Sequence, residues 1–291
     1  MTYSQNKSWA MWRLDVEASL RSAGVASANA EARWLTETVS GYESGEWSEI
    51  ATTEPRAAQI TRLESLVGRR VAGEPLQYVL GEWPFRSLDL MVDARVLIPR
   101  QETEYVVDFA LEQIDLCAGS QPNVVDLGTG SGAIALSIGL ERRSAVVHAT
   151  DLSEDSLEVA RLNGVGNGIS NVVFHLGSWF EALPENLRGT IDVLVSNPPY
   201  VAENDRENLA VEVLDYEPRR ALFSGPDGLD AIRVILRDAP QWLRKPGYVI
   251  IEHSPEQAEE IRSVAAEIGF TNVRTEMDLA GRERALIAEW S

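Results

Sequence analysis

Cysteine and histidine are scarce in this chain. Among its 291 residues there is one cysteine, Cys117, and there are three histidines, His148, His175 and His253. A single cysteine cannot form an internal disulfide or a cysteine-based metal cluster. The histidines lack the ligand spacing that is typical of a zinc site. We therefore expect no metal centre, and the reducing cytoplasm is the expected location.

Positive charge and long apolar runs are scarce as well. The chain has 26 lysines and arginines against 45 aspartates and glutamates, which gives a formal net charge of -19. Such a surface repels phosphate backbones, so we expect no direct nucleic-acid partner. No uninterrupted apolar run reaches the length of a membrane span, and the N-terminal stretch lacks the apolar core of a signal peptide. A membrane partner is therefore not expected either.

Hydrophobic residues make up 44% of the chain, enough for the core of one large domain and a small one. Residues 1–78 favour a helical domain, because apolar residues recur there at helical spacing. The residues that share a helical face are Trp9, Trp12, Val16 and Leu20; Ala32, Leu35 and Val39; and Ile60, Leu63 and Val67.

A different pattern follows in residues 79–104. Leu88, Leu90 and Val92 alternate with less apolar neighbours, and Val96 and Ile98 form a second short run. Alternation of this kind is typical of a β-hairpin. We interpret the segment as a hairpin that links two domains.

Residues 105–291 alternate between strand-like and helix-like segments. The predicted strands are 124–127, 146–150, 172–175, 191–196 and 248–252, and helical segments such as 132–143 lie between them. This alternation predicts the α/β class, with a mostly parallel sheet and helices on both faces.

A glycine-rich loop, "DLGTGSG" at residues 126–132, joins the first of these strands to a helix. Gly128, Gly130 and Gly132 allow a tight turn and a close approach of a ligand. The loop has neither the spacing of a dinucleotide site nor the lysine of a triphosphate-binding loop. Asp151 ends the next strand, where a carboxylate can accept the hydroxyls of a ribose. Together they favour S-adenosylmethionine as cofactor over a plain turn followed by a helix cap.

The strand at 191–196 runs into Asn197-Pro198-Pro199-Tyr200. The two prolines hold the backbone extended, so the Asn197 side-chain oxygen and the Pro198 carbonyl can be fixed in space. Two such acceptors suit a planar NH₂ group that becomes positive as its nitrogen attacks a methyl group. The Tyr200 ring can cover one face of that group. The motif therefore predicts a clamp for an amide or an aromatic amine, and it does not distinguish glutamine from adenine.

Longer stretches carry a resemblance to a known family. They include "GEPLQYVLGEWPFRSLDL", "VLIPRQETEYVVD", "IDVLVSNPPYVAEND" and "YEPRRALFSGPDGLDAIRVI". Over nearly its whole length the chain resembles the PrmC/HemK family, whose members methylate the glutamine of the Gly-Gly-Gln motif in peptide chain release factors. The resemblance implies a helical N-terminal domain for substrate recognition, a hairpin linker, and a Rossmann-like class I methyltransferase domain with seven strands.

The resemblance also implies residue roles and a partner. Asn197, Pro198, Pro199 and Tyr200 would hold the substrate glutamine, with Asn197, Pro198 and Tyr200 as the catalytic set, and the partner would be a release factor. Ser178 stands where the family usually has an acidic residue. The implied contacts to S-adenosylmethionine are Gly128, Thr129, Gly130, Ser131, Gly132, Asp151, Trp179 and Asn197.

Two other functions stay open at this point. The Asn-Pro-Pro-Tyr motif is shared with adenine methyltransferases, so N6 methylation of adenine in DNA or RNA is the main alternative. A non-catalytic module that retains the cofactor fold is the second alternative. The net charge of -19 argues against the first, and the intact clamp argues against the second.

Overall fold

A computed structural model describes residues 7–42, 44–117 and 121–291 of the chain. By packing, the chain divides into two compact units, Met1–Gly81 and Glu82–Ser291. The hairpin thus groups with the second unit by packing, and the division at 78 and 104 stays a prediction. Within the described ranges, no helix combines the length and the hydrophobicity that crossing a bilayer requires.

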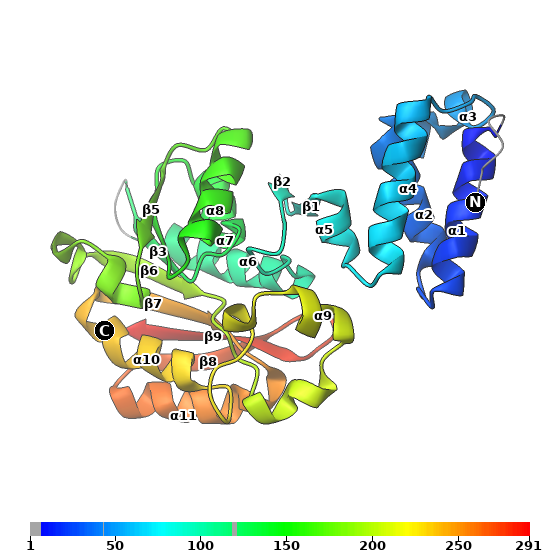
Figure 1. The fold of residues 1–291 in the computed structure, drawn as a ribbon. Helices are drawn as coiled ribbons and strands as arrows, with labels where there is room; N and C mark the ends of the chain where they lie inside the picture. The colour runs from blue at the N-terminus through cyan, green and yellow to red at the C-terminus, as the bar shows by residue number, and fades with distance from the viewer. Residues whose placement is uncertain (1–6, 43, 118–120) are drawn as a thin grey trace. The chain divides into compact units, whose positions relative to one another are not determined.

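The first unit is helical (Figure 1). Its α-helices are α1 (Trp9–Ser22), α2 (Ala28–Ser40), α3 (Trp47–Ile50), α4 (Ala57–Val71) and α5 (Leu76–Leu80). The three predicted apolar faces pack together into one core, with Leu20, Ala32 and Leu35 at 0% exposure. α2 ends at Gly41, whose positive φ of 77° suits a residue without a side chain.

The second unit begins with a hairpin of β1 (Glu82–Phe85) and β2 (Leu88–Met91), paired in antiparallel fashion. The predicted second strand at Val96 and Ile98 is wrong. Val96 donates its N–H to Asp93 in a turn, and Ile98 donates to the Glu217 side chain at 3.2 Å. Both side chains are buried, so the apolar pattern marked burial rather than a strand.

The main sheet has seven strands among the described residues, in the order β5-β4-β3-β6-β7-β9-β8. The pairs from β5 to β7 are parallel, and β9 is antiparallel to both β7 and β8. The α/β prediction is confirmed, and β3 pairs with β6. The strands are β3 (Asn123–Leu127), β4 (Val146–Asp151), β5 (Val172–Leu176), β6 (Ile191–Ser196), β7 (Leu243–Glu252), β8 (Thr271–Met277) and β9 (Glu283–Trp290).

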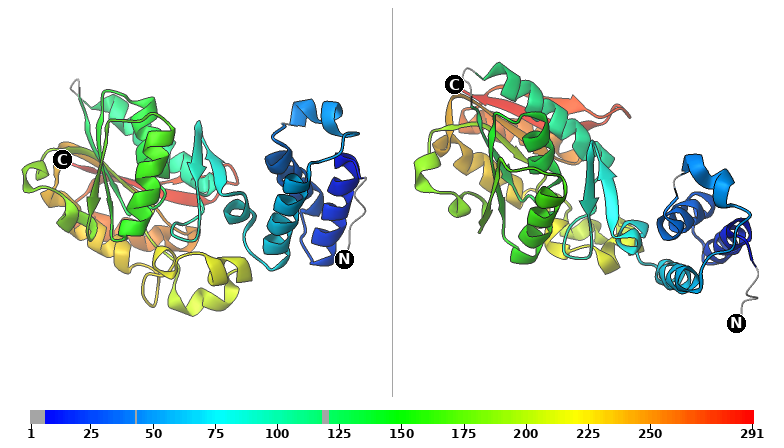
Figure 2. Two further views of the ribbon diagram at one scale, coloured as in Figure 1. Left: turned by 45° about the horizontal axis from the view of Figure 1, so that its top comes forward. Right: turned by 90° about the horizontal axis from the view of Figure 1, so that it is seen from above.

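Helices cover both faces of this sheet (Figures 1 and 2). One face carries α6 (Gln101–Leu116), α7 (Ala133–Glu141) and α8 (Glu154–Gly166), and the other carries α10 (Asp230–Asp238) and α11 (Ala258–Ile268). The short α9 (Val211–Tyr216) lies in the long connection after β6. Ser153 caps α8, because its hydroxyl accepts the Ser156 N–H at 3.3 Å.

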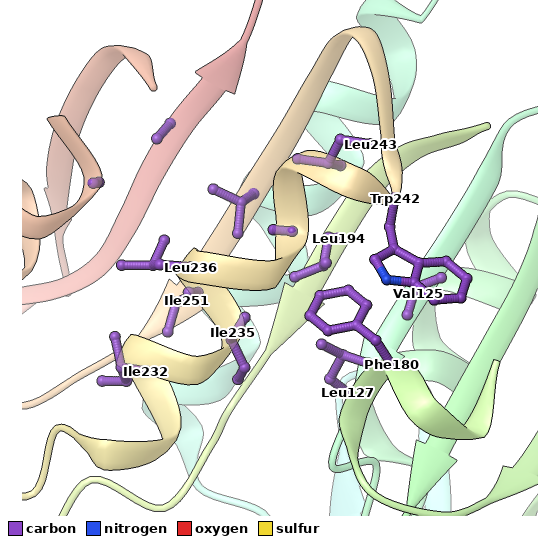
Figure 3. Close-up of a cluster of buried hydrophobic side chains, with 14 of the residues drawn as sticks. Val125, Leu127, Phe180, Leu194, Ile232, Ile235, Leu236, Trp242, Leu243 and Ile251 are labelled. Atoms are coloured by element: carbon purple, nitrogen blue, oxygen red, sulfur yellow. The ribbon is translucent and has the colours of Figure 1, made fainter. Parts of the chain in front are cut away.

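Strand β6 is the centre of the second unit, and all six of its residues are buried. It is paired on both sides and covered on both faces, which suits its apolar run Val193-Leu194-Val195. Figure 3 shows Leu194 of β6 in the cluster that packs against α10. In the same cluster, the Phe180 and Trp242 rings stack with centroids 5.7 Å apart. The strand ends that carry the candidate site therefore rest on a rigid core.

Truncation of Leu194 tests how much this core supports the site. Leu194→Ala removes a fully buried side chain and is expected to lower the free energy of unfolding by about 2–5 kcal/mol. The matched control is Leu176→Ala on β5, because Leu176 is 55% exposed and its loss is expected to cost within about 0.5 kcal/mol. Urea unfolding of the full chain measures both, and equal losses would contradict the assignment of the core.

Candidate functional site

A pocket lies where β3, β4, β5 and β6 end, which is the edge at which open α/β sheets bind ligands. We call it the strand-end pocket. Its lining residues are Arg95, Val96, Leu97, Gly128, Gly130, Thr150, Asp151, Leu152, Ser156, Gly177, Ser178, Trp179, Asn197, Pro199, Pro218, Arg220 and Ala221. Of the predicted site residues, Gly128, Gly130, Asp151, Trp179, Asn197 and Pro199 therefore line it together.

The other predicted residues of the glycine loop face the protein. The Thr129 hydroxyl donates to Asp126 at 2.6 Å, Ser131 is 3% exposed, and Gly132 lies against Leu136. Asp126 also accepts the Ala135 N–H at 3.2 Å, so one carboxylate holds the loop to the start of α7. Burial raises the pKa of Asp126 to about 7.

Asp151 is fixed by backbone donors on both of its oxygens. It accepts the Gly130 N–H at 2.9 Å and the Ser153 N–H at 2.8 Å. The carboxylate thus joins the glycine loop to the start of α8. Burial raises the pKa of Asp151, and the two backbone hydrogen bonds oppose that rise. A carboxylate held in this way has lone pairs left for ribose hydroxyls.

Trp179 lies across the glycine loop. Its backbone has a φ of 45°, a conformation that costs about 1–3 kcal/mol in a residue with a side chain. Its neighbour Phe180 is 4% exposed in the core, so the strained turn sends the two rings in different directions. A Cβ on Gly128 would lie 3.3 Å from the Trp179 ring. Glycine at 128 therefore lets the indole come close to the loop, beside the pocket.

Asn197 meets residues that are distant in sequence. Its Nδ2 donates to the Thr103 hydroxyl on α6 at 3.1 Å, and that hydroxyl donates to Glu252 at the end of β7 at 2.8 Å. The Tyr200 hydroxyl donates to the other Glu252 oxygen at 3.2 Å. Pro198 is buried. We call these four side chains, Asn197, Thr103, Glu252 and Tyr200, the Glu252 network.

Two members of the Glu252 network were missed from sequence. Glu252 ends a strand next to β6, so the strand-end rule could have found it. Thr103 lies in the first turn of a helix, and nothing local marks it as a site residue. For Tyr200, the sequence indicated a stacking ring, and the structure adds a buried partner for its hydroxyl.

The backbone carbonyl of Tyr200 is fixed by contacts with Gln257 and Gly228. Gln257 donates from Nε2 to the Tyr200 carbonyl at 3.0 Å and to the Asp227 carbonyl at 3.2 Å. Gly228 has a φ of 78°, and a Cβ there would overlap the Tyr200 carbonyl oxygen. The "GPDGL" turn is therefore a support for the Asn-Pro-Pro-Tyr segment, and only glycine fits at 228.

Comparisons with known proteins agree with this geometry. Residues 119–281 match a family model described as a methyltransferase domain, and residues 12–81 match one described as a PrmC N-terminal domain. A protein of Xylella fastidiosa named release factor glutamine methyltransferase is 43% identical over 234 residues, 80% of this chain and 83% of that protein. One of the same name from Streptomyces coelicolor is 40% identical over 266 residues, 91% of this chain and 92% of that protein.

A solved structure shares the fold. It is a methyltransferase from Pyrococcus furiosus, with a TM-score of 0.51 at 18% identity over 80% of this chain and 98% of that one. At this identity the likeness supports the sheet and helix arrangement alone.

Substitution of Gly228 tests the support for the clamp. Gly228→Ala is expected to lower both the melting temperature and the rate of turnover, because the new Cβ must displace the Tyr200 carbonyl. The matched control is Gly281→Ala, which has a similar φ of 73° and no heavy atom within 4 Å of the new Cβ. The control is expected to cost only the backbone strain, about 1–2 kcal/mol. Calorimetry measures the melting temperatures of the two variants. A smaller drop in melting temperature for Gly228→Ala than for Gly281→Ala would contradict the support role.

Proposed function

The chain belongs to the release factor glutamine methyltransferase family, and on that premise we propose which atoms of its site carry out the reaction. It is an S-adenosylmethionine-dependent methyltransferase that acts on a release factor glutamine. The atom we assign as methyl acceptor is the side-chain nitrogen, N5, of the glutamine in the Gly-Gly-Gln motif of peptide chain release factors. The location of Asn197 in the strand-end pocket is the observation that supports this assignment most directly.

The strand-end pocket fits the cofactor. It offers the Asp151 carboxylate for the ribose, the Trp179 ring for the adenine, and the close backbone of Gly128 and Gly130. When bound there, S-adenosylmethionine supplies an activated methyl group on a sulfonium. Thr129, Ser131 and Gly132 belong to the same loop. We propose that they contact the cofactor through their backbone, because their side chains or Cα atoms face the protein.

Ser178 leaves the adenine side of the pocket without the acidic contact that the family usually has. The side chain lines the pocket and has one hydroxyl in place of a carboxylate. Recognition of the adenine amine would then depend on a neutral group, which is weaker than a charged one.

For the acceptor nitrogen we propose two contacts. The Asn197 Oδ1 and the Pro198 carbonyl accept the two N–H groups of the glutamine amide. Both oxygens are fixed dipoles, and they stabilise the positive charge that develops as the nitrogen loses its conjugation with the carbonyl. One such contact is worth about 3 kcal/mol. The Tyr200 ring covers the amide face and excludes water, and Pro199 keeps the Pro198 backbone extended.

The release factor itself is the proposed partner, and the cytoplasm, where release factors act, is the proposed location. The relatives' names support the first proposal, and the single cysteine supports the second. We assign substrate recognition to residues 1–78, which contain most of the match to the PrmC N-terminal domain.

Asp151→Asn tests the cofactor assignment. An amide at this position turns a donor toward the Gly130 or the Ser153 N–H and weakens the ribose contact. We expect the dissociation constant for S-adenosylmethionine to rise about tenfold or more, since a hydrogen bond to a charged group is worth about 1.5–3 kcal/mol. Asp155→Asn, an exposed carboxylate in the first turn of α8, should leave it unchanged. Titration calorimetry measures the affinity of both variants for S-adenosylmethionine. Equal affinities would refute the role of Asp151.

The reaction is tested with radiolabelled methyl groups. The protein and S-adenosylmethionine are incubated with a release factor, with the same factor carrying Gln→Ala in its Gly-Gly-Gln motif, and with adenine-containing DNA and RNA. We expect label on the wild-type factor alone, at the glutamine side chain by mass spectrometry. Asn197→Ala should lower turnover by about 100-fold or more while cofactor affinity largely persists. Label on nucleic acid and none on the factor would support adenine methylation instead.

A further inference from the structure

We propose that Thr103 and Glu252 are positioning residues that hold the Asn197 amide with its oxygen toward the substrate, and that the proton state of Glu252 sets this orientation. The inference deepens the proposed function and rests on the role of Asn197 as an acceptor. It follows from a count of hydrogens in the Glu252 network.

The network joins three segments that are far apart in sequence. Thr103 lies in the first turn of α6, Asn197 follows β6, and Glu252 ends β7. Thr103 is 4% exposed and Glu252 is 1% exposed, so water does not supply alternative partners. The contacts are Asn197 Nδ2 to Thr103 Oγ1 at 3.1 Å and Thr103 Oγ1 to Glu252 Oε2 at 2.8 Å.

An ionised Glu252 fixes the direction of every hydrogen bond in the network. A carboxylate only accepts, so the single hydrogen of the Thr103 hydroxyl must point to Glu252. Toward Asn197 the same hydroxyl can then only accept, and only Nδ2 of the amide can donate to it. Asn197 Oδ1 is thereby turned away from Thr103 and is available as an acceptor. The Tyr200 hydroxyl satisfies the second Glu252 oxygen at 3.2 Å.

A proton on Glu252 permits the opposite arrangement. A protonated oxygen can donate to Thr103, whose hydrogen then points to Asn197, and the amide accepts it with Oδ1. Nδ2 would replace Oδ1 on the substrate side and oppose the N–H groups of the glutamine. The ionised form therefore enforces the active orientation, and the protonated form no longer does.

Several charged and titratable groups face Glu252. Burial raises its pKa to about 7, while Arg284 on β9 favours the charged form and Glu102 on α6 opposes it. Tyr200 has a raised pKa because of burial and the Glu252 charge, so it remains a donor. His253 is next in sequence, and burial lowers its pKa, which keeps the ring neutral. Turnover is accordingly expected to fall as the pH drops through about 7, the pKa of Glu252.

Thr103→Val and Thr103→Ser test the network by turnover. Valine keeps the shape of threonine and removes the hydroxyl, whereas serine keeps the hydroxyl. We expect Thr103→Val to lower kcat on a release factor by about tenfold or more with cofactor affinity unchanged, and Thr103→Ser to retain it within about threefold. Wild-type kcat in Thr103→Val would overturn the proposal. Equal losses in both variants would also overturn it, because they would indicate a packing role.

A second measurement needs no turnover. The side-chain amide of Asn197 is observed by NMR after selective ¹⁵N labelling of asparagine, with Asn197→Ala used for assignment. In the wild-type protein we expect the Asn197 amide resonances to shift with pH, with a midpoint near pH 7, the pKa of Glu252. In Glu252→Gln and in Thr103→Val we expect this pH-dependent shift to be absent. A wild-type resonance that does not titrate overturns the proposal.

The same spectra also test whether a different titrating group causes the shift of the Asn197 resonances. Asp126 also has a pKa of about 7 because of burial. If it caused the shift, the transition would persist in Thr103→Val, and the proposal would fail. If wild-type protein methylates no release factor, the proposed function fails alone, since the NMR titration still decides whether Glu252 orients Asn197.

Discussion

The orientation of one amide is the constraint on which the site depends. Asn197 follows a strand whose six residues are all buried, and its Nδ2 is held by Thr103. An amide that rotated freely would present donor and acceptor in turn to the N–H groups of the substrate, which need an acceptor. The network behind Asn197 removes that ambiguity, and Gln257 and Gly228 hold the following backbone in place. Catalysis by fixed dipoles requires this kind of preorganisation.

The sheet supplies the rest of the preorganisation. The ends of parallel strands supply part of the strand-end pocket, and these residues rest on the buried core. One residue with a strained backbone lines the pocket. Trp179 adopts a positive φ of 45°, and the glycines at 128 and 130 adopt φ values of 76° and 56°. The packing of Phe180 against Trp242 offsets the cost of that strained turn.

Much of this could be predicted from sequence, because the signals are local. The glycine loop and the Asn-Pro-Pro-Tyr segment each follow a strand directly, Asp151 ends one, and the strand pattern predicts a common edge. The predicted strand at Val96 and Ile98 was wrong because their apolar pattern reflects burial in an irregular segment. Thr103 and Glu252 are separated by 149 residues and meet only through the fold. No periodicity or motif within one segment indicates such a contact. The strained turn at Trp179 has no local sequence signal either.

The two acceptor oxygens are tested most directly by a crystal structure of the protein with S-adenosylhomocysteine and a peptide that contains Gly-Gly-Gln. The account predicts that Asn197 Oδ1 and the Pro198 carbonyl oxygen both lie about 2.7–3.2 Å from the glutamine side-chain nitrogen. Asn197 Nδ2 should remain on Thr103 in the same structure. A glutamine whose side-chain oxygen, rather than its nitrogen, contacts Asn197 would contradict the account.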